Sequence, residues 1–326
     1  MIITKTPYRI SFFGGGTDFP LWFREHGGRV LSTSIDKYCY ITCRRKPAFF
    51  PHKHRFVYSE IEDVNEVDAI RHPAIKGVLK WMNLQDGLEI HHDGDLPARS
   101  GLASSSAFTV GLLQAMHRLQ NTTIAAEILA KEAIHVEQQV IGEVVGCQDQ
   151  IAVAYGGLNR IEFHPDETFT VTPIEAPAER IASLQNHLLL FFTGFSRFAA
   201  EIESSKLVNF SQKTLALKRL MQMAVEAEQL LLDESKDLHQ FGWMLQEAWE
   251  NKKSLSAQVS TSAIDAIYNR AIAAGALGGK ILGAGGGGFI LFFVPPNKQE
   301  NVKTALSDLI EVPFAFEQEG SRVVMG

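Results

Sequence analysis

The chain has 326 residues, 45% of them hydrophobic and 21% charged, and its formal net charge at pH 7 is −6. This composition is typical of a globular protein with a sizeable core, and the length favours two domains. The negative charge argues against nucleic acid or an anionic membrane surface as the main partner. The three cysteines cannot all pair and their spacing fits no metal motif, so we expect a reduced, cytoplasmic setting.

Short runs of β-branched and aromatic residues predict the strands. A strand over residues 2–13 enters a glycine turn, and a pair of strands follows over 29–35 and 38–45. Further strands are predicted over residues 56–59, 87–92, 158–163, 169–174, 188–193, 280–282 and 289–294. The apolar runs at 188–192 and 289–294 are far too short to span a bilayer, so they indicate buried strands.

Helices are predicted where apolar residues recur every three or four positions. They cover residues 20–25, 68–82, 104–119, 124–141, 217–224, 238–249, 263–274 and 298–310, and no element is predicted for 142–157. Long helices mixed with strand pairs predict an α+β fold rather than a regular βαβ alternation. We place a boundary near residues 177–185, which divides the chain into a first domain of residues 1–180 and a second of residues 181–326.

The segment from Leu96 to Ala107, here called the serine loop, joins a predicted strand to the helix that begins near Ser104. Its small residues let a ligand approach the backbone, and the first amides of the helix have no partner within the helix. The helix dipole also favours negative charge there, so the loop is suited to phosphate. An ordinary loop with a serine N-cap would look the same, and on this segment alone that alternative stays open.

Two further stretches, residues 7–18 and 280–293, are rich in glycine. In the first, a strand delivers Arg9 and a turn delivers Asp18, which could bind sugar hydroxyls or cap the next helix. The second formally fits the dinucleotide pattern G-x-G-x-x-G, but an apolar strand follows it where that pattern needs a helix. Its glycines therefore indicate close approach to a ligand or to another loop. The P-loop sequence G-x-x-x-x-G-K-[ST] does not occur in the chain.

Two acidic residues complete the pattern. Asp149 lies in the sequence G-C-Q-D-Q, and Glu137 lies twelve residues earlier on a predicted helix. Near a phosphate site, carboxylates hold Mg²⁺ or accept a proton from the attacking hydroxyl. Each acid alone would more often be a surface or capping residue, but their occurrence together with the glycine stretches favours the phosphate-site interpretation.

Taken together, these stretches resemble the GHMP kinase family, which includes galactokinase, homoserine kinase and mevalonate kinase. The family's three motifs occur in order: the P-x-R strand and turn, the P-x-x-x-G-L-x-S-S loop and the C-terminal glycine loop. The resemblance covers essentially the whole chain. It implies an N-terminal domain like ribosomal protein S5 domain 2 and a ferredoxin-like C-terminal domain. It also implies that ATP and Mg²⁺ lie across the serine loop, with the acceptor between the domains.

The resemblance implies roles for individual residues. Galactokinases read R-V-N-L-I-G-E-H-T-D-Y where this chain reads R-I-S-F-F-G-G-G-T-D-F, and G-I-M-D-Q where it reads G-C-Q-D-Q. By this match Arg9 would stabilise the transferring phosphoryl group, and Asp149 would be the catalytic base. Ser105 and Glu137 would hold Mg²⁺. The implied nucleotide-binding residues are Pro97, Arg99, Ser100, Gly101, Leu102, Ala103, Ser104, Ser105 and Ser106.

The acceptor side departs from galactokinase, whose Glu-His is replaced by Gly15 and Gly16. Losing two sugar-contacting side chains disfavours galactose, and F-F-G-G-G-T-D resembles the subgroup that phosphorylates the anomeric hydroxyl of heptose 7-phosphate. A phosphorylated acceptor needs a positive contact, for which the basic residues of the segment 44–55 are candidates unless they form a solvated loop. These basic candidates are Arg44, Arg45, Lys53 and Arg55. The implied substrate-binding residues are Gly15, Gly16, Thr17, Asp18, Gly285, Gly286, Arg45 and Arg55.

Two other functions stay open at this point. The acceptor could be another sugar, such as fucose, glucuronate or galactose, or the chain could be a non-catalytic regulator that binds sugar and ATP. The serine pair Ser104-Ser105 and the acid Asp149 are both present, which disfavours the regulator. We therefore predict a kinase whose small-molecule partners are ATP and a sugar phosphate, with Mg²⁺ as its cofactor.

Overall fold

The computed structural model describes residues 1–84, 86–98, 100–194 and 213–326, and their strands form two sheets. The first sheet has nine strands, and its main path has the order β13-β1-β2-β5-β3-β4. Off this path, β6 and β12 pair with β2, and β7 pairs with β6. The strands are β1 (Ile2–Phe13), β2 (Gly28–Arg45), β3 (His54–Val57), β4 (Ile61–Val64), β5 (Leu88–Gly94), β6 (Leu158–Phe163), β7 (Phe169–Pro173), β12 (Phe316–Glu317) and β13 (Arg322–Met325).

β2 is a continuous strand of 18 residues, so the prediction of two separate strands in this region was wrong. It runs antiparallel to β1 along almost its whole length. The register shifts between Pro7 and Tyr8, which leaves Asp36 and Lys37 as a bulge in β2. In the sequence this polar pair resembles a turn, but the bulge lets the strand continue past it.

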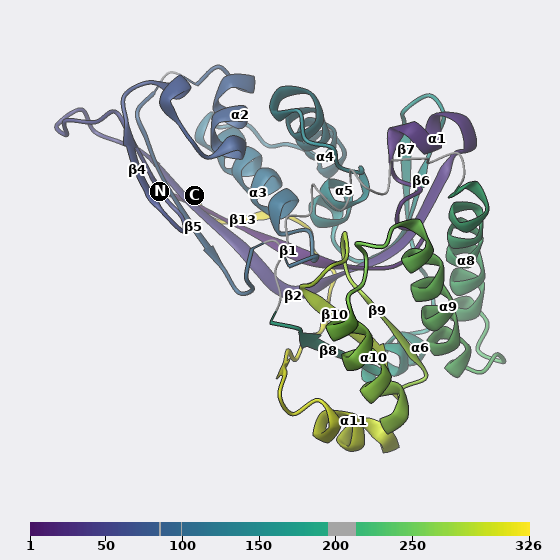
Figure 1. Cartoon of the computed structure of the whole chain (residues 1–326). Coiled ribbons are helices and arrows are strands. Elements are labelled where there is room, and N and C mark those ends of the chain that lie inside the picture. The colour runs from purple at the N-terminus through teal and green to yellow at the C-terminus, as the bar shows by residue number, and fades with distance from the viewer. Residues whose placement is uncertain (85, 99, 195–212) are drawn as a thin grey trace.

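Four helices cover one face of the first sheet (Figure 1). They are α2 (Pro73–Trp81), α3 (Ser104–Leu119), α4 (Ala126–His135) and α5 (Gln148–Tyr155); the shorter segments are α1 (Pro20–His26), the 3₁₀ turn η1 (Val67–Ala69) and the π-helical turn η2 (Val136–Ile141). α3 begins at Ser104, as predicted, and packs on β1 and β2. α5 lies where we predicted no element, because glycines on both sides of this short helix hide its pattern.

The second sheet is antiparallel, with the order β11-β8-β10-β9. Its strands are β8 (Leu188–Phe192), β9 (Gly278–Ile281), β10 (Phe289–Phe293) and β11 (Ile310–Glu311); the helical segments of this part of the chain are α6 (Ala178–Asn186), α8 (Thr214–Leu232), α9 (His239–Leu255), α10 (Ser262–Ala274), η4 (Pro296–Lys298) and α11 (Gln299–Ala305). The apolar runs that predict buried strands form β8 and β10 at its centre. The predicted α+β fold is confirmed.

The two sheets are joined by a continuous core. Phe241 of α9 packs edge-on against Phe12 and Phe13 at the end of β1, with ring centroids 5.3 and 5.1 Å apart. Lys280 of β9 donates from Nζ to the backbone oxygens of Ser11 and Phe12, at 3.0 and 2.7 Å. These contacts fix the end of β1 against the second sheet.

The last two strands leave the second sheet and return to the first. β13 pairs with β1 and β12 pairs with β2, so the two ends of the chain lie near one another (Figure 1). The final strands of the predicted second domain, 181–326, therefore belong to the first sheet.

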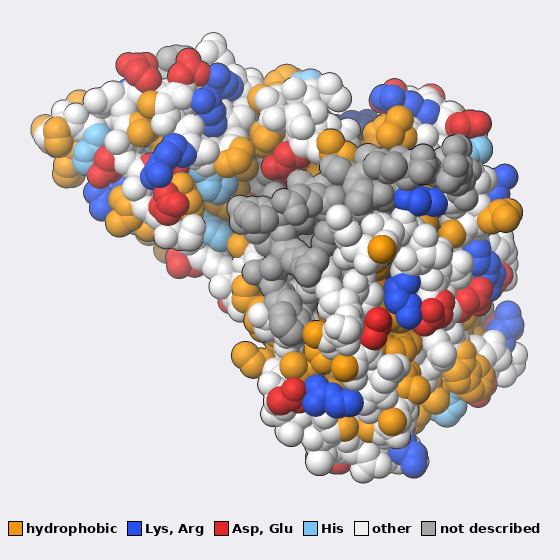
Figure 2. All heavy atoms as spheres, viewed as in Figure 1, with side chains coloured by type: hydrophobic (Ala, Val, Ile, Leu, Met, Phe, Trp, Pro, Cys, Tyr) orange, Lys and Arg blue, Asp and Glu red, His pale blue; other side chains and the backbone are white. Residues whose placement is uncertain are grey.

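The surface carries both signs of charge. On the face seen in Figure 2, the described acidic and basic side chains are interspersed. In the described part of the chain, no helix combines the length and the apolar character needed to cross a membrane. Cys39, Cys43 and Cys147 are buried and unpaired.

The serine loop and the C-terminal glycine stretch are in direct backbone contact. A Cβ on Gly283 would lie 2.4 Å from Gly101 Cα, and one on Gly288 would lie 2.3 Å from the carbonyl oxygen of Ser100. The amide of Phe289 donates to the same oxygen at 3.2 Å. The sequence left open whether these glycines approach a ligand or another loop, and at Gly283 and Gly288 they approach the serine loop.

We expect Gly101→Ala to destabilise the protein more than Gly142→Ala. Both glycines have a positive φ, +85° and +81°, so each substitution adds backbone strain of about 1–2 kcal/mol. Only at Gly101 would the methyl also meet backbone, 2.5 Å from the oxygen of Leu282, whereas nothing lies within 4 Å of it at Gly142. Urea unfolding midpoints measure the difference, and equal shifts would mean that the two loops separate at little cost.

Candidate active site

A pocket of about 360 Å³ lies where the end of β1, the serine loop, η2 and α5 meet α9 and β9. It collects residues that are far apart in the sequence. The predicted site residues that line it are Arg9, Gly15, Gly16, Asp18, Gly101, Ala103, Ser104, Ser105, Ser106, Glu137 and Asp149. The structure thus brings the glycine turn, the serine loop and both predicted acids to one cavity.

Arg9 and Asp149 form the central ion pair of this pocket. The Arg9 Nε and Nη2 groups both donate to Asp149 Oδ1, at 2.8 and 2.6 Å. Its Nη1 donates to the carbonyl oxygen of Gly101 at 2.8 Å, and its backbone amide donates to the oxygen of Leu102 at 3.1 Å. No described residue donates a hydrogen bond to Asp149 Oδ2. The pair therefore holds the carboxylate in one orientation and leaves one oxygen for a substrate hydroxyl.

Asp18 ties the glycine turn to the start of α5. Its Oδ1 accepts a hydrogen bond from the amide of Gly16 at 2.9 Å, and its Oδ2 accepts one from the amide of Gln148 at 3.3 Å. A Cβ on Gly146 would lie only 1.9 Å from Asp18 Oδ2, so the two segments touch. The next helix, α1, has no capping side chain, so Asp18 does not take the capping role that the sequence left open; it holds the start of α5 instead and lines the pocket.

Glu137 is a buried acid with one unused oxygen. It lies in the π-helical turn η2 and is 1% exposed. Its Oε2 accepts hydrogen bonds from Ser106 Oγ, at 3.1 Å, and from the side-chain amide of Gln150, whereas Oε1 has no partner. Burial raises the pKa of this carboxyl to about 7. A buried carboxyl with an unbonded oxygen lowers the stability of the fold. π-helical turns are frequent at functional sites, so both observations favour a functional role for Glu137.

The first turn of α3 opens toward the pocket without a capping side chain. Its N-cap residue is Ala103, in the left-handed conformation at φ 67° and ψ 30°, and alanine has no oxygen to bond the first amides. Ser104 and Ser105 follow and line the pocket. The positive end of the helix dipole and these hydroxyls therefore favour an anion at this point.

The pocket also contains two lysines that we did not predict, Lys252 of α9 and Lys280 of β9. Both are at least nine-tenths buried. Lys252 Nζ donates to the backbone oxygens of Ile281 and Gly283 at 2.7 and 2.6 Å. A signal for Lys252 was present in the sequence, because it continues the apolar helical face that includes Trp249.

Several predicted residues lie away from the pocket. Gly285 and Gly286 lie against Val259, whose oxygen accepts a hydrogen bond from the Gly286 amide at 2.8 Å. Thr17 is buried and bonds to the backbone of the glycine turn. Pro97, Ser100 and Leu102 do not line the cavity, and Arg99 lies outside the described residues.

The predicted acceptor-phosphate residues Arg45 and Arg55 are not brought to the pocket. Arg9 is opposite Ser34, and Arg45 lies at the far end of β2, roughly 30 Å further along the strand. Arg45 pairs with Asp86, and Arg55 pairs with Asp63. The basic segment therefore belongs to the outer end of the sheet.

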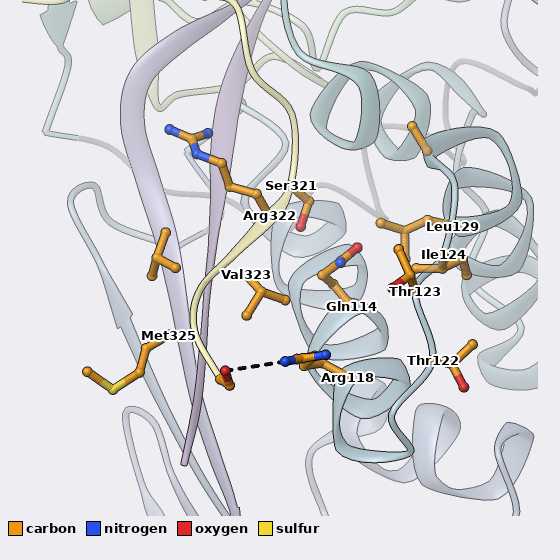
Figure 3. A pocket seen from close by; sticks show the side chains of 13 residues that line it. Gln114, Arg118, Thr122, Thr123, Ile124, Leu129, Ser321, Arg322, Val323 and Met325 are labelled. Carbon is orange, nitrogen blue, oxygen red and sulfur yellow. Dashed lines mark hydrogen bonds between the residues drawn. The ribbon is translucent and has the colours of Figure 1, made fainter.

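A second pocket, of about 460 Å³, lies between α3, the α3–α4 loop and β13 (Figure 3). Arg118 points toward the chain end there and donates to the carbonyl oxygen of Gly326 at 3.3 Å (Figure 3). Arg322 pairs with Glu317 and Glu319. None of the buried polar side-chain atoms that lack a partner in the described residues belongs to this pocket. Among the described residues, this second pocket therefore lacks the unpartnered buried polar atoms that line the first pocket.

Comparison with known proteins places these features in a family. The model of the GHMP kinases N terminal domain matches residues 70–157, and the model of the GHMP kinases C terminal domain matches residues 226–311. The chain is 31% identical to the D-glycero-alpha-D-manno-heptose 7-phosphate kinase of Campylobacter jejuni, over 98% of this chain and 97% of that protein. It is 25% identical to the galactokinase of Pyrococcus furiosus, over 94% of this chain and 92% of that protein.

Solved structures agree with this assignment. The crystal structure of a D-glycero-D-manno-heptose 1-phosphate kinase from Bacteroides thetaiotaomicron superposes with a TM-score of 0.82 and 25% identity, covering 100% of this chain and 99% of that one. Both family models match this chain, and relatives match it along nearly its full length. The chain belongs to the GHMP kinase family and is an ATP-dependent phosphotransferase that acts on an alcohol group.

Proposed function

We propose that this sugar kinase transfers the γ-phosphoryl group of ATP to the anomeric hydroxyl of a heptose 7-phosphate, giving the 1,7-bisphosphate. The observation that carries the proposal is the Arg9–Asp149 pair beside the uncapped start of α3. Gly15 and Gly16 stand where galactokinases have Glu-His, which supports an acceptor other than galactose. The 31% identity to a heptose 7-phosphate kinase supports the same acceptor.

The residues of the pocket suit a direct in-line transfer. The serine loop and the first amides of α3 bind the phosphates of ATP. Asp149 accepts the proton of the attacking hydroxyl through Oδ2, while Arg9 holds Asp149 through Oδ1 and offsets negative charge on the transferring group. Most of the rate enhancement then comes from positioning and electrostatics.

The donor set around Glu137 fits Mg²⁺. The unused Glu137 Oε1 is an oxygen ligand of the kind that Mg²⁺ prefers, and we propose Ser105 of the same pocket as a second ligand. The described residues contain no cluster of three or more His, Cys, Asp or Glu side chains for a metal, so the remaining ligands would be phosphate oxygens and water. Bound Mg²⁺ would neutralise charge on the phosphate oxygens.

Positive charge for a phosphorylated acceptor is present within the pocket itself. Arg45 and Arg55 lie at the outer end of the sheet, whereas Lys252 and Lys280 line the pocket beside Arg9. We therefore propose that these two lysines, rather than the basic segment, provide the positive potential for the phosphates of ATP and of the acceptor.

The acceptor is tested by a screen of sugars and sugar phosphates for ATP-dependent products, with the position of the new phosphate read by NMR. Heptose 7-phosphate should be the best acceptor and should gain its phosphate on the anomeric oxygen. A preference for unphosphorylated fucose, glucuronate or galactose would replace this proposal by the second candidate, a kinase for another sugar. If the protein consumes ATP with none of these sugars or sugar phosphates, both candidate functions are contradicted.

Asp149→Asn should lose turnover by about 10²–10⁴-fold, the usual contribution of a general base. Binding of ATP, measured by calorimetry, should change little because the serine loop is intact. Asp166→Asn is the matched control, since that aspartate lies on the exposed turn between β6 and β7, where it accepts hydrogen bonds from Thr168. Near-normal turnover of Asp149→Asn would remove Asp149 as the base.

Glu137→Gln should stabilise the metal-free protein more at pH 8 than at pH 5. The pKa of Glu137 rises from 4.5 to about 7 on folding, so its ionisation lowers stability as the pH increases through that window. The amide has no such ionisation, and the difference should reach a few kcal/mol above pH 7. Urea unfolding with a chelator present measures it. The same variant should lose Mg²⁺-ATP turnover.

Ser105→Ala separates the metal role of Glu137 from its role in stability. Ser105 is exposed, so this change should weaken the Mg²⁺ dependence of turnover without altering the pH profile of unfolding. If the difference in unfolding free energy between Glu137→Gln and the parent does not vary with pH, the assignment of the raised pKa to Glu137 is wrong.

A further inference from the structure

Unpartnered buried oxygens gather in the active-site pocket. In the described part of the chain, six buried side-chain oxygens have no hydrogen-bond partner, and four of them line this cavity. These four are Ser11 Oγ, Glu137 Oε1, Gln148 Oε1 and Gln150 Oε1. Each buried oxygen lowers the stability of the fold if nothing bonds to it, so a cluster of them indicates a place where a ligand supplies donors.

Two of these residues, Ser11 and Gln148, converge above Gly15. A Cβ built on Gly15 would lie 3.7 Å from Ser11 Oγ and 3.6 Å from Gln148 Nε2. Gly15 also lines the pocket, so the three residues form a small polar notch in its wall. We call it the Gly15 notch.

The Gly15 notch lies next to the reacting groups. Ser11 is two residues from Arg9 on β1, and alternate residues of a strand lie on the same face. Gln148 immediately precedes Asp149 at the start of α5, and its backbone N–H donates a hydrogen bond to Asp18 Oδ2. A sugar whose attacking hydroxyl is bound at Asp149 therefore has its neighbouring hydroxyls within reach of the notch.

Gly15 differs from the glycines on either side of it. Gly14 and Gly16 have positive φ values of 84° and 100°, and a Cβ on Gly14 would lie 1.9 Å from the oxygen of Arg29. Gly15 has no positive φ, and its added Cβ would make only ordinary van der Waals contacts. Neither the backbone nor the packing requires glycine there, so what glycine provides at this position is space in the pocket.

We infer that Ser11 and Gln148 recognise hydroxyls of the acceptor sugar in the space left by Gly15. This inference rests on the proposed sugar-kinase function and assigns acceptor contacts to it. A serine hydroxyl and a glutamine amide each both donate and accept, as sugar hydroxyls do, so two neighbouring hydroxyls satisfy the unpartnered oxygens. The notch thus sets which hydroxyl configuration is accepted beside the reacting oxygen.

Gln148→Met tests this inference, because it keeps the length of the side chain and removes its amide. We expect about a tenfold higher KM for the acceptor identified by the screen, an unchanged KM for ATP and a smaller change in kcat. Ser11→Ala should act in the same direction. Gln120→Met, at an exposed position after α3, is the matched control and should leave all three constants unchanged.

Gly15→Ala provides a second variant that the fold accommodates. Its unfolding midpoint should equal that of the parent, while its KM for the acceptor rises at least tenfold because the methyl fills the notch. A series of monodeoxy acceptors then identifies the contact: for one of them, Gln148→Met and the parent should have the same KM, since the hydrogen bond is already missing.

Different results would contradict the proposed sugar-kinase function and the role of the Gly15 notch. If the parent protein phosphorylates no sugar, the proposed function is wrong. If it does so and all three notch variants keep the acceptor KM within twofold, the notch inference is wrong and the function stands. An equal rise of KM for ATP and acceptor would also overturn the inference, because it would indicate a general distortion of the pocket.

Discussion

The buried Arg9 guanidinium is the constraint on which the arrangement of this active site depends. A buried charge is tolerated only when it is paired and hydrogen-bonded, and the Arg9 guanidinium meets this need with two segments: Asp149 of α5 and the backbone oxygen of Gly101 in the serine loop. Removing either of these partners would leave part of that charge uncompensated. The ion pair that orients the proposed base is therefore also the contact that fixes the serine loop and α5 relative to β1. Catalytic geometry and folding are coupled through a single side chain.

The pocket combines this well-satisfied pair with oxygens that are not satisfied. Glu137 keeps one oxygen unbonded in a buried position, and Ser11 and Gln148 do the same nearby. A protein selected for stability alone would fill these positions with apolar side chains of similar size, because an unpaired buried oxygen costs more than the hydrophobic replacement. Their concentration in one cavity is the kind of local cost that functional sites carry, and it distinguishes this pocket from the larger one beside β13.

Sequence patterns predicted the parts of the fold that depend on local information. The start of α3 at Ser104 and the strands β8 and β10 follow from small residues before a helical pattern and from short apolar runs. Two features that local patterns did not predict depend on long-range contacts. The bulge at Asp36 and Lys37 lets β2 continue because β1 lies beside it, and the final strands return to the first sheet because their partners are there. Lys252 was missed because a lysine on an apolar helical face is assigned to the surface until its carbonyl partners are known.

The glycines show most clearly where sequence reasoning stops. Gly283 and Gly288 allow the serine loop to approach, Gly14 and Gly16 allow a positive φ, and Gly15 leaves room in the pocket. In the sequence these residues are equivalent members of two glycine-rich stretches, and a family motif covers both stretches alike. Only the atoms around the position that a Cβ would take show whether a glycine is required by the fold or leaves space in the pocket. Because Gly15 is the member with neither strain nor a close contact, a side chain can be added there without backbone strain or a clash, which makes it the position in the turn where the shape of the pocket can most easily change.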